Sequence, residues 1–230
     1  MESKPLPKIV AIDGPAGSGK STIASLVSRK LGWDYLNTGT LYRLIGFLAK
    51  QNKVALSAEQ ELSELITNCA PAIQWREGIF YYKGSNISMD LQNEDIGQLA
   101  SDVAKSKLVR SLLLPIQRNL ALSAQKGVII DGRDIGTVVF PNADLKIFMT
   151  ADLKARAQRR LKQIPQQKST PLPSLQEITD DLRRRDEQDA QRAIAPLQKA
   201  VDAIEFDTSV SSLEDCVASL VNLICERLSA

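Results

Sequence analysis

Histidine is absent from the 230 residues of this chain, which removes the commonest general base and the commonest metal-ligating side chain. Any chemistry that the protein performs must therefore need neither. The 3 cysteines, Cys69, Cys216 and Cys225, form no C-x-x-C pair. An odd number of cysteines without metal-ligand spacing argues against a disulfide framework or a zinc site and favours a reducing compartment.

Long apolar runs and an excess of one charge are also missing. No stretch approaches the length of a membrane span, and residues 1–8 lack the apolar segment of a signal peptide. The 29 Lys and Arg nearly balance the 27 Asp and Glu, so composition gives no support for a nucleic-acid or membrane partner. We expect a soluble, cytoplasmic protein that is long enough to bury a substantial core.

The most informative short motif begins at Gly14. Residues 14–21, GPAGSGKS, fit G-x-x-x-x-G-K-[ST]; they follow a strand-like run and precede a helix-forming segment. Its glycines allow backbone N–H groups to surround a polyphosphate at a helix N-terminus. Lys20 would reach the β- and γ-phosphates, and the Ser21 hydroxyl would bind magnesium. The motif predicts a nucleoside triphosphate site made by Gly14, Pro15, Ala16, Gly17, Ser18, Gly19, Lys20, Ser21 and Thr22.

A second strand, polar turn and helix follow between residues 33 and 51, and this repetition predicts a parallel sheet with helices outside it. Thr38, Tyr42 and Arg43 lie near the start of that helix, where they suit a second anion. A solvated first turn explains them equally well.

Residues 52–126 combine helical patterns with an interruption of the β/α alternation. Ser57 to Gln60 predicts a capping box at the start of a helix. Short β-prone runs between residues 72 and 88 predict a small antiparallel insertion. Helices are predicted at 93–105 and 108–125, the second perturbed at Pro115.

An apolar run at 127–130 ends in Asp131 and resembles a Walker B strand, in which the carboxylate lies near magnesium and the P-loop hydroxyl. Arg133 and Asp134 follow it. Because ligands bind at the carboxyl ends of strands in α/β sheets, these charges are candidates for substrate binding.

Two sets of charged residues occur at helical spacing in the last third of the chain. Arg156, Arg159 and Arg160 share one face of a predicted helix at 153–164. Arg185, Asp189 and Arg192 share one face of a predicted helix that starts near Ser174. Each set fits either phosphate binding or a solvated, salt-bridged surface.

The remaining segments complete the β/α pattern. A strand is predicted at 144–150, and residues 165–173, with three prolines, predict a mobile loop. A final strand is predicted at 203–207 and a final helix at 212–228, with Ser212 and Asp215 as its cap.

The reaction class follows from what accompanies the P-loop. A GTPase would carry an N-K-x-D motif, which is absent, and a motor would need further subdomains. The arginines exceed what one triphosphate requires, so two phosphate-bearing substrates are favoured. A phosphate monoester is mainly dianionic at pH 7 and needs no general base, in keeping with a chain that lacks histidine. An alcohol acceptor would call for a positioned carboxylate instead.

Four blocks in order resemble bacterial cytidylate kinases: residues 12–22, 37–43, 131–141 and 185–197. The block DGRDIGTVVFP at 131–141 is much more specific than the P-loop. The resemblance implies transfer of the γ-phosphoryl group of ATP to CMP or dCMP, with Mg2+. It also implies an α/β fold like that of adenylate kinase, with a parallel five-stranded sheet flanked by helices, an inserted monophosphate-binding subdomain with a small antiparallel sheet, and a helical lid.

The resemblance also implies how one domain, residues 1–230, is divided. The core would comprise 8–36, 108–150 and 196–230; the monophosphate-binding part would be about 37–107, with its β insertion at 72–88; the lid would be about 152–175. We expect a monomer without nucleic-acid or membrane partners. The alternative is a P-loop kinase with the same core and another acceptor, UMP or shikimate.

Carried over position by position, the resemblance implies a site for CMP. Asp134, Arg110 and Ser101 would match the amino donor and two acceptors of cytosine, whereas UMP would place a carbonyl against Asp134. Arg43, Arg133 and Arg192 would bind the phosphate, and Asp189 with Arg185 the ribose. The full set is Thr38, Tyr42, Arg43, Ser101, Arg110, Arg133, Asp134, Arg185, Asp189 and Arg192.

The same resemblance implies catalytic and metal-binding roles. Positive charge around the transferring phosphoryl group would come from Lys20, Arg133, Arg156, Arg160 and Arg192. Ser21 and Asp131 would hold magnesium, directly or through water.

Overall fold

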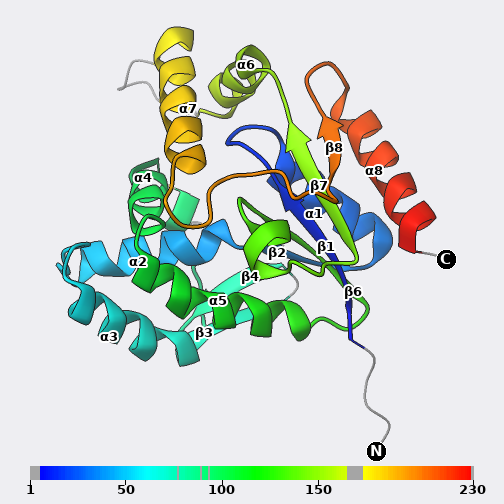
Figure 1. Cartoon of the computed structure of the whole chain (residues 1–230). Helices are drawn as coiled ribbons and strands as arrows, with labels where there is room; N and C mark the ends of the chain where they lie inside the picture. The colour runs from blue at the N-terminus through cyan, green and yellow to red at the C-terminus, as the bar shows by residue number, and fades with distance from the viewer. Residues whose placement is uncertain (1–5, 77, 89, 93, 165–172, 229–230) are drawn as a thin grey trace, which may run out of the picture. The chain divides into compact units, whose positions relative to one another are not determined.

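Two β-sheets organise the described part of the chain (Figure 1). The structure, a computed structural model, describes residues 6–76, 78–88, 90–92, 94–164 and 173–228. The larger sheet is parallel and has five strands, as predicted, and their order is β2-β6-β1-β7-β8. These strands are β1 (Lys8–Asp13), β2 (Asp34–Asn37), β6 (Gly127–Gly132), β7 (Leu145–Thr150) and β8 (Ile204–Asp207).

The central strands are continuous apolar runs, because a parallel strand covered on both faces has no solvated side. Residues 10–12 of β1 and 128–130 of β6 are fully buried. Strand β1 pairs in parallel with β7, placing Val10 opposite Leu145, and β7 pairs in parallel with β8. The loops that follow β1 and β7 therefore leave the same edge of the sheet, which is where folds of this kind bind ligands.

The chain divides into two compact units, and the first contains Trp33–Ile130 with the described residues up to Ile9. Apolar residues of its first helix, Gly39–Gln51, recur at i, i+3, i+4 and i+7, and the side chains of Leu41, Leu44, Ile45 and Leu48 are buried. A Cβ atom on Gly46 would lie 2.9 Å from the Cβ of Leu99, so two helices approach closely there. The helices are α2 (Gly39–Gln51), α3 (Glu59–Cys69), α4 (Glu94–Val103) and α5 (Lys107–Leu122), with 3-10 turns η1 (Ala70–Ala72) and η2 (Asp90–Gln92).

A small antiparallel sheet belongs to the first unit and confirms the predicted insertion. Its strands are β3 (Ile73–Arg76), β4 (Ile79–Tyr82) and β5 (Ser85–Asn86), in that order. The indole N–H of Trp75 donates to the carbonyl oxygen of Tyr35 at 3.1 Å, which fixes β3 to the residues of β2.

Two details of the predicted helices differ from the structure. The capping box at Ser57 is wrong, because α3 begins at Glu59 and its N-cap, Ala58, has no side chain able to accept a hydrogen bond. Helix α5 runs from Lys107 through Pro115, as predicted, but ends at Leu122, short of the predicted end at Gln125. The predicted start of a helix at Asn93 lies outside the described residues.

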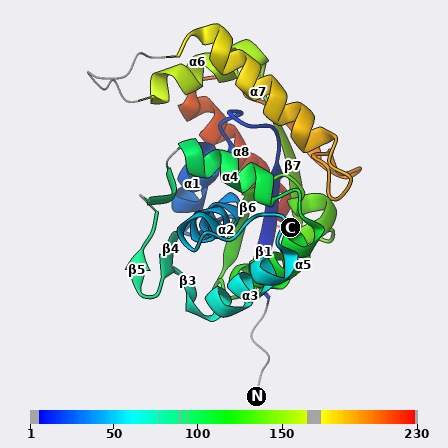
Figure 2. The ribbon, with the colours of Figure 1, turned by 90° about the vertical axis from the view of Figure 1, so that its left-hand side faces the viewer.

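The second unit contains Val10–Gly32 and the described residues from Asp131 onward. Its helices are α1 (Lys20–Leu31), α6 (Leu153–Gln163), α7 (Leu175–Ala190) and α8 (Leu213–Leu228), with a π-helical turn η3 (Ile135–Val139). Helices α1 and α8 lie side by side, as do α6 and α7, which pack through Ala157, Ile178 and Leu182 (Figures 1 and 2). Residues 165–172 of the predicted proline-rich loop lie outside the described residues.

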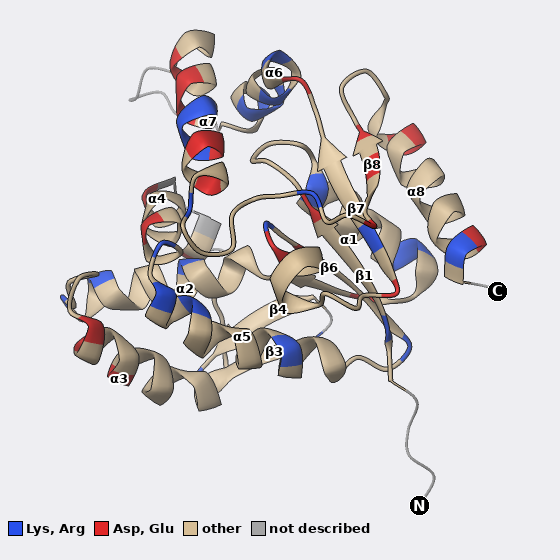
Figure 3. Ribbon diagram, in the orientation of Figure 1, with Lys and Arg blue, Asp and Glu red and all other residues tan. Residues whose placement is uncertain are grey.

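The predicted cap of the last helix is confirmed, since the Asp215 N–H donates to the Ser212 hydroxyl at 3.1 Å. A capping box also begins α7, where Ser174 and Glu177 bond reciprocally. Within the described ranges, no helix combines the length and the apolar character needed to cross a membrane. Figure 3 shows basic residues along α6 and residues of both charges along α7.

Candidate active site

The P-loop lies where β1 ends, and its first glycine is required by space as well as by conformation. Gly14 has φ 151°, and a Cβ atom there would lie 2.0 Å from the carbonyl oxygen of Met149. The loop then turns back, and Gly19, with φ 91°, precedes the first helical residue, Lys20. The strand, glycine-rich loop and helix N-terminus predicted from the sequence are therefore present.

Lys20 is a buried cation whose hydrogen bonds are made to uncharged oxygens. Its Nζ donates to the carbonyl oxygen of Pro15 at 2.7 Å and lies 3.5 Å from the Ser18 hydroxyl. Burial, and next the positive charge of Arg133, lower the pKa of Lys20 to about 7. A bound phosphate would reverse this shift, because a nearby anion favours the charged amine.

Ser21 and Asp131 meet across 110 residues of sequence. The Ser21 hydroxyl donates to Oδ2 of Asp131 at 2.7 Å. A hydroxyl and a carboxylate are hard oxygen donors, the type that Mg2+ prefers. These two side chains therefore have the donor chemistry to hold a magnesium ion.

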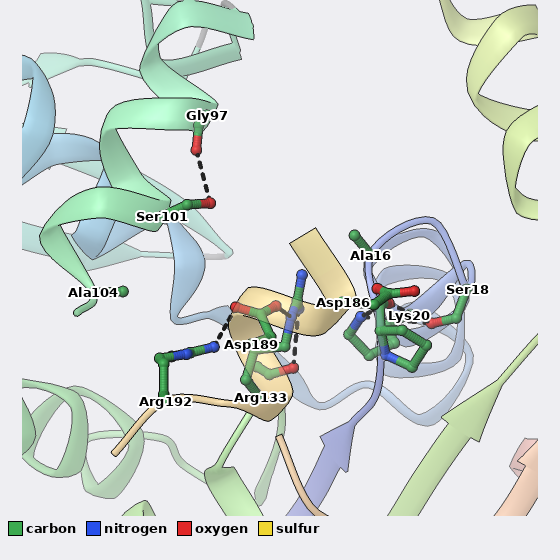
Figure 4. A network of polar contacts seen from close by, with 12 residues as sticks. Ala16, Ser18, Lys20, Gly97, Ser101, Ala104, Arg133, Asp186, Asp189 and Arg192 are labelled. Atoms are coloured by element: carbon green, nitrogen blue, oxygen red, sulfur yellow. Dashed lines mark hydrogen bonds and ion pairs between the residues drawn. The ribbon is translucent and has the colours of Figure 1, made fainter. Parts of the chain in front are cut away.

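A second cluster joins one carboxylate to two arginines (Figure 4). The Arg133 Nε donates to Asp189 at 2.6 Å, and Arg192 donates to the other oxygen of Asp189. Burial alone would raise the pKa of Asp189, but the charges of Arg133 and Arg192 outweigh it and lower the pKa. Asp189 thus stays ionised. Its carboxylate holds together two guanidinium groups that would otherwise repel each other.

The position of Arg192 differs from the prediction. A helical spacing of i, i+4 and i+7 placed Arg185, Asp189 and Arg192 on one helix face, but α7 ends at Ala190. Arg192 reaches Asp189 from the chain beyond the helix. Arg185 lies within the helix and forms an ion pair with Asp181, with 2.8 Å between its Nε and the carboxylate, whereas Asp189 is bonded to Arg133 and Arg192.

The arginines of α6 do not form an exposed stripe. The side chain of Arg156 is only 8% exposed and contacts the P-loop, donating to the carbonyl oxygen of Ala16 at 3.0 Å. It also donates to Asp186 of α7 at 2.6 Å. Arg159 donates to the hydroxyl and the carbonyl oxygen of Thr208. Arg160 is partly buried.

The residues of the first unit that were predicted to bind CMP are mostly buried. This burial argues against the alternative that Thr38, Tyr42 and Arg43 form a solvated first helical turn. Arg110 lies over the ring of Tyr42, with 5.5 Å between the guanidinium carbon and the ring centroid, and donates to Ala104 at 3.4 Å. Arg43 donates to the Leu91 carbonyl oxygen at 2.8 Å, and the Ser101 hydroxyl donates to that of Gly97 at 3.3 Å. Thr38, 3% exposed, precedes α2.

Sequence reasoning missed three polar residues of the second unit. Asp186 anchors Arg156, and Thr208 lies 2.9 Å from the carbonyl oxygen of Ser18 in the P-loop. Asp13 accepts hydrogen bonds from the N–H groups of Ile135 and Gly136, at 2.8 and 2.7 Å. The available signal for Asp13 was its place at the carboxyl end of β1, directly before the P-loop.

The stability of the fold should depend on pH through Asp13. Burial raises the pKa of Asp13 to about 6. Hydrogen bonds from the N–H groups of Gly136 and Ile135 lower the pKa, but they do not offset the effect of burial. Because this pKa exceeds the unfolded value of 3.8, the folded protein binds the proton more tightly, and the contribution of Asp13 to stability falls as pH rises from about 4 to 6. Relative to Asp13→Asn, the wild type should lose about 1 kcal/mol between pH 5 and 7.

Urea unfolding of both proteins at the two pH values measures this difference, and the groups common to both cancel. A difference that does not change with pH would contradict the assignment of the shift to Asp13.

The parallel sheet, the P-loop and the paired Ser21 and Asp131 define the class of this protein, an α/β P-loop kinase. A profile of the cytidylate kinase family matches residues 10–226. The chain belongs to the cytidylate kinase family.

Relatives named cytidylate kinase are similar in sequence to this chain along nearly its whole length. A cytidylate kinase from Thermotoga maritima is 42% identical over 221 residues, covering 96% of this chain and 98% of the relative. One from Stutzerimonas stutzeri is 40% identical over 230 residues, covering 97% of each. Among solved structures, a shikimate kinase from Acinetobacter baumannii in complex with shikimate is similar in structure. The match covers 99% of this chain and 97% of the shikimate kinase, at 14% sequence identity and a TM-score of 0.48. The family membership does not favour UMP or shikimate as the acceptor.

Proposed function

We propose that this protein transfers the γ-phosphoryl group of ATP to CMP or dCMP, giving ADP and CDP or dCDP, as a step of pyrimidine nucleotide metabolism. The observation that carries the proposal is membership of the cytidylate kinase family over residues 10–226. The protein would act as a cytoplasmic monomer whose partners are ATP and CMP or dCMP, without nucleic acid or membrane.

For ATP, the residues from Gly14 to Thr22 would surround the phosphates with backbone N–H groups, and Lys20 would pair with the β- and γ-phosphates. Phosphate binding is supported by the state of Lys20, a buried amine bonded to neutral oxygens. Ser21 and Asp131 would hold Mg2+, directly or through water, and the ion would supply positive charge to the phosphate oxygens.

For CMP, three groups of residues would serve different parts of the nucleotide. Arg43, Arg133 and Arg192 would bind its phosphate, and Asp189 with Arg185 the ribose hydroxyls. Thr38 and Tyr42 would complete the site, Tyr42 by holding Arg110, whose guanidinium lies over its ring. Ser101, Arg110 and Asp134 would read cytosine.

Transfer itself needs charge and alignment more than proton transfer. Lys20, Arg133, Arg156, Arg160 and Arg192 would stabilise the charge of the transferring phosphoryl group. Arg156 supports this proposal because it already contacts the P-loop through the Ala16 carbonyl oxygen. The acceptor phosphate is its own nucleophile, since its second pKa of about 6 leaves it mainly dianionic at pH 7.

The first test offers CMP, dCMP, UMP, AMP and shikimate separately with ATP and Mg2+ and measures ADP release. We expect turnover with the cytidine nucleotides and about a hundredfold preference for CMP over UMP, as sites built around a substrate amine reject its analogues. Asp134→Asn should reduce this preference by about tenfold or more, because an amide can donate to the uracil carbonyl.

The matched control is Asp180→Asn, which makes the same chemical change in an exposed ion pair with Arg183 on α7. It should leave the preference unchanged. Turnover with another acceptor alone would refute the proposed reaction, and an unchanged preference in Asp134→Asn would refute the role of Asp134.

A further inference from the structure

Asp13 is a buried carboxylate to which the proposed reaction gives no role. It is the last residue of β1, is 5% exposed, and directly precedes Gly14. Its Oδ1 accepts from the Ile135 N–H at 2.8 Å and its Oδ2 from the Gly136 N–H at 2.7 Å. Two charge-assisted bonds to successive peptide groups fix both the position and the direction of that backbone.

The fixed backbone is the one that carries Asp134. The Ile135 N–H belongs to the peptide bond between Asp134 and Ile135, so the bond to Asp13 sets the orientation of the peptide that leaves Asp134. The Asp134 carbonyl oxygen in turn accepts from the N–H groups of Val138 and Val139, at 2.9 and 3.1 Å. Asp134 has φ −144° and ψ 26°, a conformation of neither strand nor helix, at the point where β6 gives way to the π-helical turn.

We propose that Asp13 is a positioning residue for base selection: it holds the backbone of residues 134–136 so that the Asp134 carboxylate keeps the direction needed to bind the amino group of cytosine. The inference rests on the proposed function of Asp134. It gives Asp13 no contact with substrate. Because Gly14 follows Asp13 in the chain, one carboxylate links the strand that leads to the P-loop with the turn that selects the acceptor.

The substitution Asp13→Asn removes one of the two hydrogen bonds to the 135–136 backbone with little change in side-chain shape. The carbonyl oxygen of the asparagine can accept one N–H, but its amide nitrogen would face the other N–H as a second donor. In Asp13→Asn we expect the CMP to UMP ratio of kcat/KM to fall about tenfold, the size expected when one buried hydrogen bond is lost. The KM for CMP should rise by a similar factor.

ATP binding is followed separately, because the charge of Asp13 also raises the pKa of Lys20. The Kd of a fluorescent ATP analogue should change by less than about threefold in Asp13→Asn. Asp180→Asn again serves as the matched exposed control. Equal losses on the ATP and CMP sides, with an unchanged CMP to UMP ratio, would show a merely structural role and overturn the proposal.

A double-mutant cycle separates positioning from general destabilisation. If Asp13 acts through Asp134, then Asp13→Asn in the Asp134→Asn background should change the CMP to UMP ratio by less than about twofold. Independent, multiplicative effects would overturn the proposal. If Asp134→Asn alone leaves the ratio unchanged, the base-reading role itself fails; a normal ratio in Asp13→Asn alone refutes only the present inference.

A backbone variant covers the case in which Asp13→Asn does not fold. Replacement of the Gly136 amide by an ester, through incorporation of glycolic acid at that position, removes one donor and keeps the Asp13 side chain. The CMP to UMP ratio should again fall, by about threefold to tenfold. An unchanged ratio in this variant would overturn the proposal.

Discussion

Replacing Lys20 with Met should lower kcat for CMP phosphorylation by about a hundredfold or more, since that is the usual cost of removing one preorganised charge from a transition state. The methionine side chain has a similar length and fills the same buried space without the amine. The P-loop backbone, shaped by Gly14 and Gly19, should therefore survive, and the loss should come from the chemistry.

The same substitution should make the ligand-free protein more stable. Burial, then the charge of Arg133, lower the pKa of Lys20 to about 7, well below the unfolded value of 10.5. A lysine charged below pH 7 in the folded state therefore opposes folding there, and this cost fades as pH rises toward 10.5. The gain in unfolding free energy of Lys20→Met over wild type should be larger at pH 6.5 than at pH 9.

Steady-state kinetics with ATP and CMP, together with urea unfolding at both pH values, check the two parts. Lys30→Met is the control, because Lys30 is an exposed residue in the last turn of the same helix. A folded Lys20→Met protein with near-normal kcat would remove Lys20 from the phosphate site.

The parts of the site that the sequence predicts well are those set by local geometry. The glycine spacing of the P-loop determines its backbone, because only glycine fits where a Cβ atom of residue 14 would meet Met149. The pairing of Ser21 with Asp131 was also predictable, since a parallel sheet brings the carboxyl ends of its strands to one edge.

What the sequence could not provide is the choice of partner for a charged side chain. Arg156 fits an exposed stripe as well as a buried contact; only the packing of α6 against α7 brings it to Asp186, 30 residues away. The bonds of Asp13 to Ile135 and Gly136 span 122 and 123 residues and end on backbone N–H groups, which leave no mark in the side-chain pattern.

Helix ends were a second source of error. A serine followed by a suitable residue three positions later predicts a cap at Ser57 and at Ser212, yet only the second forms it. The prediction that Arg192 lies on the helix was wrong for a similar reason, because nothing in the residue spacing shows that α7 ends at Ala190. The contact between Arg192 and Asp189 depends on the turn that follows.

Arg192→Ala should also lower kcat for CMP phosphorylation by about a hundredfold or more, for the reason that applies to any preorganised charge at the transferring group. The side chain of Arg192 is only 7% exposed, and its guanidinium shares Asp189 with Arg133. Without it, Arg133 would pair with Asp189 alone, and the net positive charge available to a phosphate would fall by one. Arg183→Ala, which breaks an exposed ion pair of α7, is the control.

Loss of activity in Arg192→Ala has a second physical explanation: the buried carboxylate of Asp189 keeps only one of its two guanidinium partners, which destabilises the fold. The double variant Arg192→Ala with Asp189→Asn distinguishes the two, because it removes the carboxylate charge as well. We expect thermal unfolding to return toward the wild-type temperature while kcat stays low, since the phosphate would still lack its arginine. If activity returns with stability, Arg192 supports the fold and does not act on the phosphate; if Arg192→Ala alone keeps kcat within about threefold of wild type, it does neither.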